Sequence, residues 1–497
     1  MFKNLVYCVS FLCLLNSTTL YANEIRQSPY KTDLWERLIF FHNGAFQITD
    51  RNFLLSHKNP SVKLELSLTI KAMKNNPSFI CKYPARYKYL TENSLLAIQD
   101  ANCPNLKKYR ENVIADKFYY IFASKNFTSI TSFMGHSLLA VSGTDLSGKE
   151  RSHAYTFFAN LYDVNIFTLL YDAFIGGLEG VFALSPLSEK LNEYLDEGRE
   201  IWRLELNISQ QKRALLKDSL WELKDVKPEY FLHDFNCATI IYYSLGIVLP
   251  DILASQSFFT SPVDIYKSLQ IKNYIKNIQI QYKEDTFEQL GKDYSTVQPS
   301  LEMQDSSIGV YYKDGVHLTF MGASHRTRTP QIATIEQTRL KIGEIDFNIT
   351  KNKIENFSAY EYLDLPRHKG LSSHLFLGAS RNDYTNYDKL RPNAAMSFGS
   401  DWQYGKASFS VLAGARVQAK DLVNPILESF SSYKFNDYTT FTLATEFQTN
   451  GENELYKTKA LFSKRVSKNW VIFAGYDVMK SNNFNEEHLV TGIDYHF

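Results

Sequence analysis

The chain has 497 residues and a formal net charge of +1. This length exceeds one typical domain, so we expect two or three domains. The near-neutral charge lacks the basic footprint of a nucleic-acid binder, and we expect no nucleic acid among the partners. The 32 tyrosines and 35 phenylalanines favour β-strands and aromatic girdles over a helical bundle.

Residues 1–22 have the features of a secretory signal peptide. Lys3 supplies a positive charge, an apolar stretch runs from about Leu5 to Leu15, and Ala22 ends a fitting cleavage site. The alternative is a membrane anchor, but the apolar stretch is short and no stop-transfer flank follows it. The mature chain is therefore expected in an oxidising compartment.

Three cysteines remain after the signal peptide: Cys81, Cys103 and Cys237. Cys81 and Cys103 lie in one segment, so we expect them to form a disulfide. An odd number of cysteines in an oxidising compartment leaves one free thiol, which on this count is Cys237. Cysteine counting alone leaves two interpretations of that thiol open, an inert buried residue and a nucleophile.

The hydrophobic patterning of the sequence divides the mature chain into four regions. Residues 24–115 look mostly helical and form an accessory domain, whereas residues 116–260 mix strands and helices as an α+β domain does. Residues 261–304 are interpreted as a linker. Residues 305–497 show repeated period-two alternation broken by short polar turns.

Within the α+β region, strand patterns alternate with helix signals. Ser185 and Pro186 look like the N-cap and first residue of a helix that ends near Gly198. The most apolar stretch, residues 165–187, is expected to be a core helix followed by a loop, or functionally a lid or acyl-chain groove. The other expected elements are strands at 118–122, 133–141, 153–158 and 201–206, and helices starting at Ser209 and Cys237.

The C-terminal region contains about twelve alternating segments, which is typical of an antiparallel transmembrane β-barrel. In one of them Val316 and Phe320 alternate with His317 and Thr319. Export, together with a last amphipathic strand that ends in Phe497, favours the bacterial outer membrane. The alternative is a soluble sandwich or a lipocalin-like barrel.

Two short stretches carry candidate chemistry. His136 interrupts an apolar strand directly after Gly135, and Asn236 is a suitable N-cap for a helix that opens with Cys237. A helix N-terminus stabilises a thiolate, and a nearby imidazolium lowers the thiol pKa further. A Cys–His pair is the minimal nucleophile and base for acyl transfer. Taken singly, a strand histidine is more often structural.

Four segments in this order resemble the Lnb N-terminal periplasmic domain family: SFMGHSLLAV, GGLEGVFALSPLSEKLNEY, IWRLELNISQQKRALLKDSLWELK and FLHDFNCATIIYYSL. The resemblance covers roughly residues 116–250. The CKYPARYKYL stretch with Cys103 resembles the accessory N-terminal segment of Gram-negative relatives, which also end in a predicted barrel. The resemblance implies a permuted papain-like thiol fold, as in lecithin:retinol acyltransferases and permuted NlpC-type hydrolases.

The resemblance also implies roles for single residues. The family's histidine falls on His136 and its cysteine on Cys237. A third polar residue on the next strand often orients the imidazole in this superfamily, and His153 is the nearest candidate, although the family more often carries Ser-Tyr at this place. Asp234 and Asn236 would polarise the site or cap the helix, and capping is the preferred interpretation.

The family's named member is a lipoprotein N-acyltransferase, which implies acyl chemistry. We expect an outer-membrane protein with a periplasmic Cys–His domain that transfers or hydrolyses acyl groups through a thioester. Two alternatives are a peptidoglycan amidase or endopeptidase of the NlpC-like class, and a non-enzymatic anchor or pore with a degenerate thiol domain. The expected partners are outer-membrane lipid and either lipoproteins or peptidoglycan, and no cofactor or metal is expected.

Overall fold

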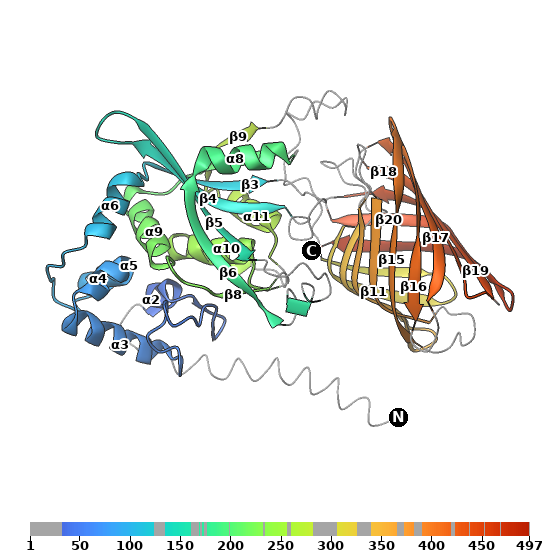
Figure 1. The fold of residues 1–497 in the computed structure, drawn as a ribbon, viewed down its shortest axis with the longest axis horizontal. Helices are drawn as coiled ribbons and strands as arrows, with labels where there is room; N and C mark the ends of the chain where they lie inside the picture. Colours follow the sequence, from blue (N-terminus) through green and yellow to red (C-terminus); the bar gives the residue numbers. More distant parts are fainter. Residues whose placement is uncertain are drawn as a thin grey trace.

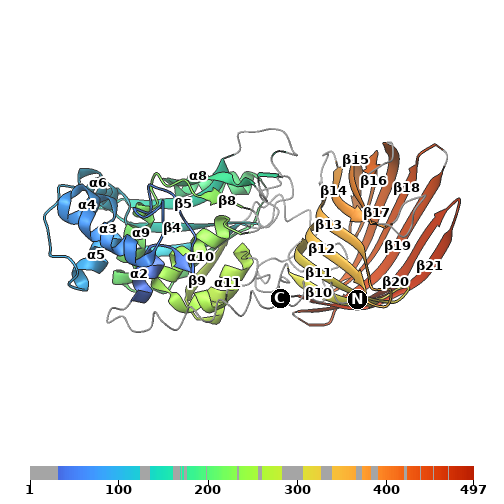
Figure 2. The same cartoon turned by 90° about the horizontal axis from the view of Figure 1, so that it is seen from below.

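The computed structural model divides the chain into a helix-covered sheet and a closed barrel (Figures 1 and 2). The signal peptide, residues 132–134, much of the apolar stretch 165–187, and Phe497 lie outside the described residues. The structure describes residues 32–123, 135–160, 168, 171–172, 176–197, 199–231, 234–255, 260–281, 306–325, 339–364, 372–381, 390–418, 423–436, 438–451, 453–467 and 469–496.

The N-terminal half is built on an antiparallel sheet of seven strands in the order β8-β6-β5-β4-β3-β7-β9. Consecutive strands β3 to β6 pair with their chain neighbours, and β7 and β9 extend the sheet beyond β3. The strands are β3 (Lys117–Ala123), β4 (His136–Thr144), β5 (Glu150–Asn160), β6 (Leu178–Pro186), β7 (Ile201–Leu206), β8 (Glu229–Tyr230) and β9 (Ile275–Gln281).

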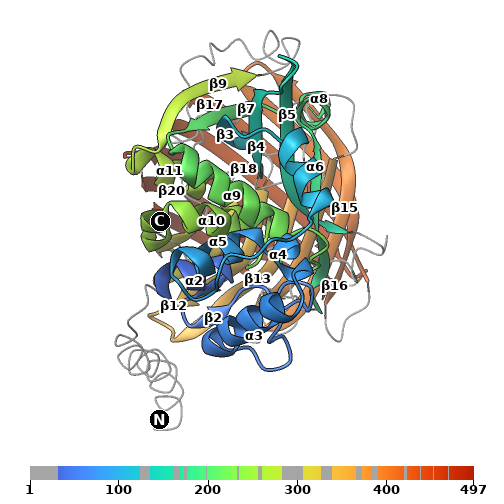
Figure 3. The ribbon, with the colours of Figure 1, turned by 90° about the vertical axis from the view of Figure 1, so that its left-hand side faces the viewer.

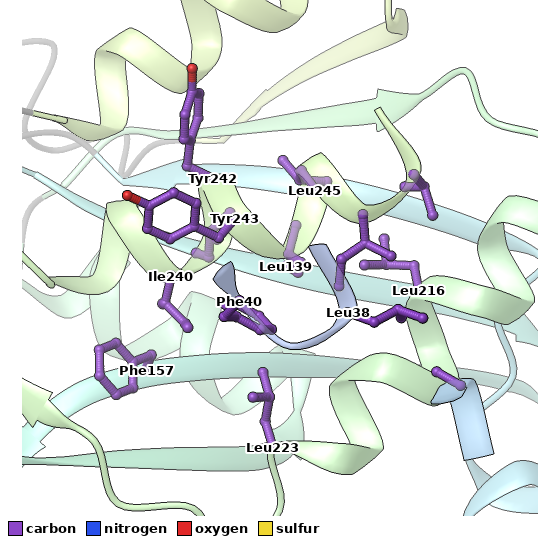
Figure 4. Packing of buried hydrophobic residues seen from close by; sticks show 14 of the residues in the cluster. Leu38, Phe40, Leu139, Phe157, Leu216, Leu223, Ile240, Tyr242, Tyr243 and Leu245 are labelled. Carbon is purple, nitrogen blue, oxygen red and sulfur yellow. The ribbon is translucent and has the colours of Figure 1, made fainter. Parts of the chain in front are cut away.

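Strand alternation gives this sheet two apolar faces, and different helices cover them. On one face Leu139 and Phe157 pack against α9 and α10 in the main core (Figure 4). On the other face Leu138 and Ala140 pack against α8, and Figures 1 and 2 show α8 and α10 on opposite sides of the strands. The helices of this half are α8 (Leu187–Asp196), α9 (Gln210–Glu222), α10 (Cys237–Val248), the 3-10 helix η3 (Pro250–Ser255) and α11 (Pro262–Ile271).

The accessory helices share the main core with the sheet rather than forming a core of their own. Leu38 and Phe40 lie in the same cluster as Tyr243 of α10 (Figure 4), and Figure 3 shows the accessory helices beside α9 and α10. The predicted helical accessory region and the α+β region are therefore one packed unit. The accessory elements are α2 (Thr32–Leu38), β1 (Phe41–His42), β2 (Ala45–Phe46), α3 (Val62–Asn75), α4 (Ser78–Lys82), α5 (Pro84–Glu92) and α6 (Pro104–Asn112).

A buried ion cluster also joins the two regions. Arg86 of α5 pairs with Glu65 of α3 and with Glu222 of α9, each at 3.0 Å, and its guanidinium group lies over the rings of Phe53 and Tyr83. Glu222 also accepts hydrogen bonds from two backbone N–H groups in the first turn of α5. The cluster thus ties α5 to α9 through charge and through helix capping.

The predicted disulfide between Cys81 and Cys103 is confirmed, with the two Cα atoms 5.3 Å apart. It connects the end of α4 to Cys103, the residue directly before α6. Cys237 is a free, buried cysteine, as the cysteine count predicted.

Three element predictions in this half were wrong. Residues 261–281 belong to the sheet domain and not to a linker: Ser261 caps α11 with a capping box, and β9 pairs with β7. Ser185 and Pro186 end strand β6 instead of starting a helix, and α8 begins at Leu187. Residues 178–186 of the predicted helix-and-loop stretch are likewise strand, because short apolar runs suit both helix and strand.

The predicted barrel is confirmed as a closed sheet of twelve antiparallel strands in chain order, with β10 paired to β21. Outward residues such as Phe398 and Leu489 are exposed, whereas inward residues such as Arg416 and Glu428 are buried. The strands are β10 (Ser307–Tyr312), β11 (Val316–His325), β12 (Arg339–Asn348), β13 (Lys353–Asp364), β14 (Ser372–Ser380), β15 (Arg391–Tyr404), β16 (Ala407–Gln418), β17 (Asn424–Asn436), β18 (Thr439–Thr449), β19 (Glu454–Arg465), β20 (Trp470–Ser481) and β21 (Asn485–His496).

The outside of the barrel carries an aromatic girdle at one rim. This rim includes the start of β10 and the end of β21, since Ser307 pairs with His496, and it includes the short turn between Tyr404 and Ala407. Girdles of this kind mark a membrane–water interface. The exposed girdle residues are Trp402, Tyr404, Phe409, Tyr433, Phe435, Tyr438, Phe441, Phe462 and Trp470. Separately, none of the helices in the described residues is long and apolar enough to span a bilayer.

Candidate active site

Cys237 is the first residue of α10, and the sequence around it explains the helix start. The Asn236 side chain accepts hydrogen bonds from the N–H groups of Ala238 and Thr239, at 2.8 and 3.0 Å. An N-cap of this type satisfies donors that have no partner inside the helix. The capping prediction for Asn236 is confirmed. Asp234 is exposed, and its backbone carbonyl accepts a hydrogen bond from the Thr239 hydroxyl.

Several donors surround the buried sulfur of Cys237. Burial raises the pKa of the thiol, and hydrogen bonds from the Ser137 backbone N–H and from the Tyr230 hydroxyl act in the opposite direction. Burial also raises the pKa of Tyr230, so its hydroxyl keeps its proton and can donate. The net effect at rest is a protonated thiol in a setting that is ready to stabilise a thiolate.

Ser137 shares this site with Cys237 through its position on β4. Its side chain is 1% exposed and points to the same face as Leu139, toward α10. The Ser137 hydroxyl lies beside the sulfur and beside Tyr120, and its hydrogen bonding lowers the pKa of both groups against the effect of burial. The site therefore holds a buried hydroxyl in direct reach of the sulfur.

His136 points to the opposite face of β4 from Ser137, because neighbouring strand residues alternate. Its ring lies 5.8 Å from the ring of Tyr194 on α8, measured between centroids. Burial lowers the pKa of His136 to about 3, and the charges of Arg199 and Lys190 lower it as well. The groups that hydrogen-bond to the Cys237 sulfur belong to Ser137, Tyr230 and Ala238, and the Cys–His pair stays a prediction.

Gly135 explains how β4 starts so close to its neighbour. Its φ angle is +82°, and an added Cβ would lie 2.8 Å from the Ala123 carbonyl oxygen and from the Phe122 ring. Only glycine tolerates both conditions without strain. The glycine before the histidine therefore allows the backbone to enter β4 in close contact with Phe122 and Ala123 of β3.

His153 does not lie beside His136. Strand β5 places it opposite Val141 of β4, which is five residues beyond His136, and on the other face of the sheet. Five residues of strand span roughly 16 Å. The predicted orienting role is therefore wrong for this geometry, because the β4–β5 register decides which residues meet.

Sequence reasoning missed Tyr230 and Ser137. Tyr230 lies seven residues before Cys237 in β8, a two-residue strand that pairs with Leu178 and Glu179 of β6. Nothing in its local pattern indicates that it reaches Cys237. Ser137 was within the quoted histidine strand, and period-two alternation was the signal that it and His136 face different ways. No group of three His, Cys, Asp or Glu side chains in the described residues could hold a metal ion.

These features define a barrel protein of the bacterial outer membrane that carries an N-terminal α/β domain with a capped, donor-surrounded cysteine. A closed barrel with an apolar outside satisfies every backbone hydrogen bond within a bilayer. Residues 105–272 match the family model of the Lnb N-terminal periplasmic domain. Residues 27–93 match a second model, a domain of unknown function (DUF7843).

The family prediction is thus confirmed for residues 105–272, and the match includes α11, which had been assigned to the linker. The location is confirmed as well: the barrel lies in the outer membrane, and the Lnb domain N-terminal to it lies in the periplasm. The girdled rim contains the start of β10, the first strand after the periplasmic domain, so this rim faces the periplasm.

Among solved structures, the chain is similar to porins at low identity. The KdgM porin, solved with disordered oligogalacturonate, is 12% identical; the match covers 39% of this chain and 98% of that chain, with a TM-score of 0.26. The NanC porin is 10% identical, with 39% and 100% covered and a TM-score of 0.27. A loop-deletion mutant of OmpT from Vibrio cholerae is 9% identical, with 77% and 98% covered and a TM-score of 0.22. Comparison with curated proteins gave no match.

Proposed function

We propose that the Lnb domain is a permuted papain-like thiol enzyme that transfers or hydrolyses acyl groups on lipid or lipoprotein substrates. The observation that supports this best is the set of donors around Cys237: the Ser137 N–H, the Tyr230 hydroxyl and the first turn of α10. Donors fixed around a sulfur stabilise the thiolate, and donors fixed beside it stabilise the oxyanion of acyl transfer.

The proposed reaction has two halves. The Cys237 sulfur attacks the carbonyl carbon of an acyl ester, a C–S bond forms, and the ester C–O bond breaks while the alcohol leaves with a proton. An amine or a water then attacks the thioester and releases the acyl product and the free thiol. The Ser137 N–H and the Tyr230 hydroxyl would hold the oxyanion in both halves.

We assign His136 as the proton acceptor of this reaction. Burial and the nearby cations lower its pKa to about 3, so the imidazole is neutral at periplasmic pH but a weak base where it lies; it becomes basic enough to take the thiol proton when it leaves that position. The ring must leave Tyr194 and pass the end of β4 to reach the sulfur.

The test is replacement of Cys237 by Ala in cells, followed by mass spectrometry of lipids and lipoproteins. Loss of one acylated species, with His136→Asn giving the same loss, is the expected result. Tyr242→Phe is the matched control. The Tyr242 hydroxyl also belongs to α10, but it donates its hydrogen bond to the Ile252 carbonyl. Unchanged acylation in the Cys237→Ala cells would overturn acyl transfer, and an altered muropeptide profile would favour an NlpC-like peptidoglycan hydrolase.

A second candidate is a non-catalytic thiol domain on a membrane anchor. Two observations favour it: burial raises the pKa of Cys237, and the His136 ring lies on the other face of the sheet. Iodoacetamide labelling of the folded protein at neutral pH separates the two candidates. Labelling of Cys237 only after unfolding supports the non-catalytic domain, and prompt labelling of the folded chain supports the enzyme.

A further inference from the structure

A groove of about 730 Å³ lies between helices α6 and α9 and the face of strands β5 and β6. Its volume is within the range of small-molecule sites. His153 lines this groove, whereas Cys237 and His136 do not. The groove is therefore separate from the candidate active site, and the proposed function does not use it.

Aromatic ring surface forms much of the groove. Tyr155, Phe182 and Trp221 line it, and the polar tips of the tyrosine and the tryptophan are occupied elsewhere. Trp221 donates its N–H to the Cys81 carbonyl at 2.9 Å, and the Tyr155 hydroxyl lies 2.6 Å from the hydroxyl of Tyr109. A ligand in the groove therefore meets the faces and edges of these rings. Ring faces are negative and attract the C–H bonds of a sugar.

Polar side chains line the opposite wall in a helical pattern. Asn105, Lys108 and Asn112 share one face of α6. The ammonium of Lys224, two residues beyond the end of α9, lies over the Trp221 ring, 5.0 Å from its centre. These α6 residues and Lys224 are exposed to solvent. Two lysines against one aspartate leave the wall positively charged.

One buried polar atom in this groove, Nδ1 of His153, has no hydrogen-bond partner in the described chain. A buried polar atom without a partner costs free energy, and native proteins keep few of them. This atom lies on the sheet side of the groove, opposite the amides of α6. A ligand with hydroxyl or amide groups on both edges would satisfy the two sides together.

We propose that this groove binds an acidic glycan, a chain of N-acetylated amino sugars that carry carboxylates. Sugar rings would stack on Tyr155 and Phe182, their amide and hydroxyl groups would bond to Asn105 and His153, and a carboxylate would bind Lys108. An acyl chain fits poorly, because amides and ammonium groups interrupt the apolar lining. The disulfide supports the site, since Cys103 starts α6 and Cys81 holds Trp221.

Calorimetry on the full-length protein in detergent tests this proposal. The probe is the disaccharide of N-acetylglucosamine and N-acetylmuramic acid, and neutral chitobiose is the comparison. We expect the acidic disaccharide to bind, and the double variant Lys108→Ala and Lys224→Ala to weaken binding by about tenfold or more. Lys107→Ala is the matched control, since Lys107 is exposed on α6 but does not line the groove.

Three results would overturn the proposal: equal binding of chitobiose, no effect of the double lysine variant, or binding of dihexanoylphosphatidylglycerol in place of the disaccharide. The Cys237→Ala variant is measured alongside. We expect this variant to bind the disaccharide as the wild type does. Binding in the groove is then tested separately from acyl transfer at Cys237. Loss of binding in Cys237→Ala would contradict a separate site.

Discussion

Tyr230 changes the interpretation of how the pKa of the Cys237 thiol is set. Its hydroxyl donates to the Cys237 sulfur and lowers the pKa of a thiol that burial raises. A conventional Cys–His pair would give this task to an imidazolium, and here a neutral phenol performs it. The sulfur is therefore tuned by hydrogen bonding and not by a neighbouring charge.

We expect Tyr230→Phe to slow alkylation of Cys237 by iodoacetamide at neutral pH by about tenfold, because one hydrogen bond to the thiolate is lost. The rate should recover as the pH is raised, since more thiol then ionises. Tyr242→Phe should keep the wild-type rate at every pH. An unchanged rate in Tyr230→Phe would show that the phenol does not support the thiolate.

The site was predictable from sequence only where its causes are local. Asn236 and Cys237 are adjacent, and a cap followed by an apolar run is a local signal. Whether His136 or Ser137 faces that cysteine depends on which side of β4 receives α10, and no local pattern specifies this. Tyr230 reaches the sulfur through a strand of two residues, too short to leave a pattern in the sequence.

At the scale of elements, the Arg86 cluster is the main polar link between the accessory helices and α9. Replacing Arg86 by Met would leave Glu65 and Glu222 buried without their cation. We expect the unfolding free energy of the periplasmic unit to fall by about 3–5 kcal/mol, the usual cost of removing one partner of a buried pair. Urea unfolding followed by tryptophan fluorescence measures it, and adding Glu222→Gln to Arg86→Met should restore part of the loss.

The same cluster gives stability a pH dependence. Burial raises the pKa of Glu222 from 4.5 to about 7. A carboxyl with a raised pKa binds its proton more tightly in the folded chain, so its contribution is full below about pH 4.5 and is lost as the pH rises through about 7. Wild-type stability should therefore fall more than that of Glu222→Gln between pH 5 and pH 8. Parallel curves for the two proteins would contradict the shift.

Element predictions succeeded where patterns were long and failed at short apolar runs. The twelve barrel strands and helices α9 and α10 carry clear periodicity or clear caps. Strand β6 reads LEGVFALSP, a short apolar run that suits helix and strand equally until β5 pairs with it. Helix α11 could have been predicted from the sequence. Ser261 and Asp264 have the spacing of a capping box, and Pro262 between them is favoured at the first helical position.

At the scale of the whole molecule, the apolar outside of the barrel is its contact with lipid. Phe398 is 45% exposed at the middle of β15, whereas Tyr404 is 75% exposed at the girdled rim. We expect Phe398→Arg to lower barrel stability in liposomes by about 2–4 kcal/mol, and Tyr404→Arg by about 1 kcal/mol or less. Equal effects of the two substitutions would place the bilayer at a different height on the barrel.

The shortness of strand β10 affects how this barrel is expected to unfold. It is six residues long, whereas its partner β21 is twelve. On that side, residues 485–490 of β21 pair with no other described strand. The first and last strands are thus paired along only half the length of β21. We expect a pulling force or a rising denaturant concentration to separate β10 from β21 before any other pair of neighbouring barrel strands. The β10–β21 pair closes the barrel, and it is also the pair that we expect to open first.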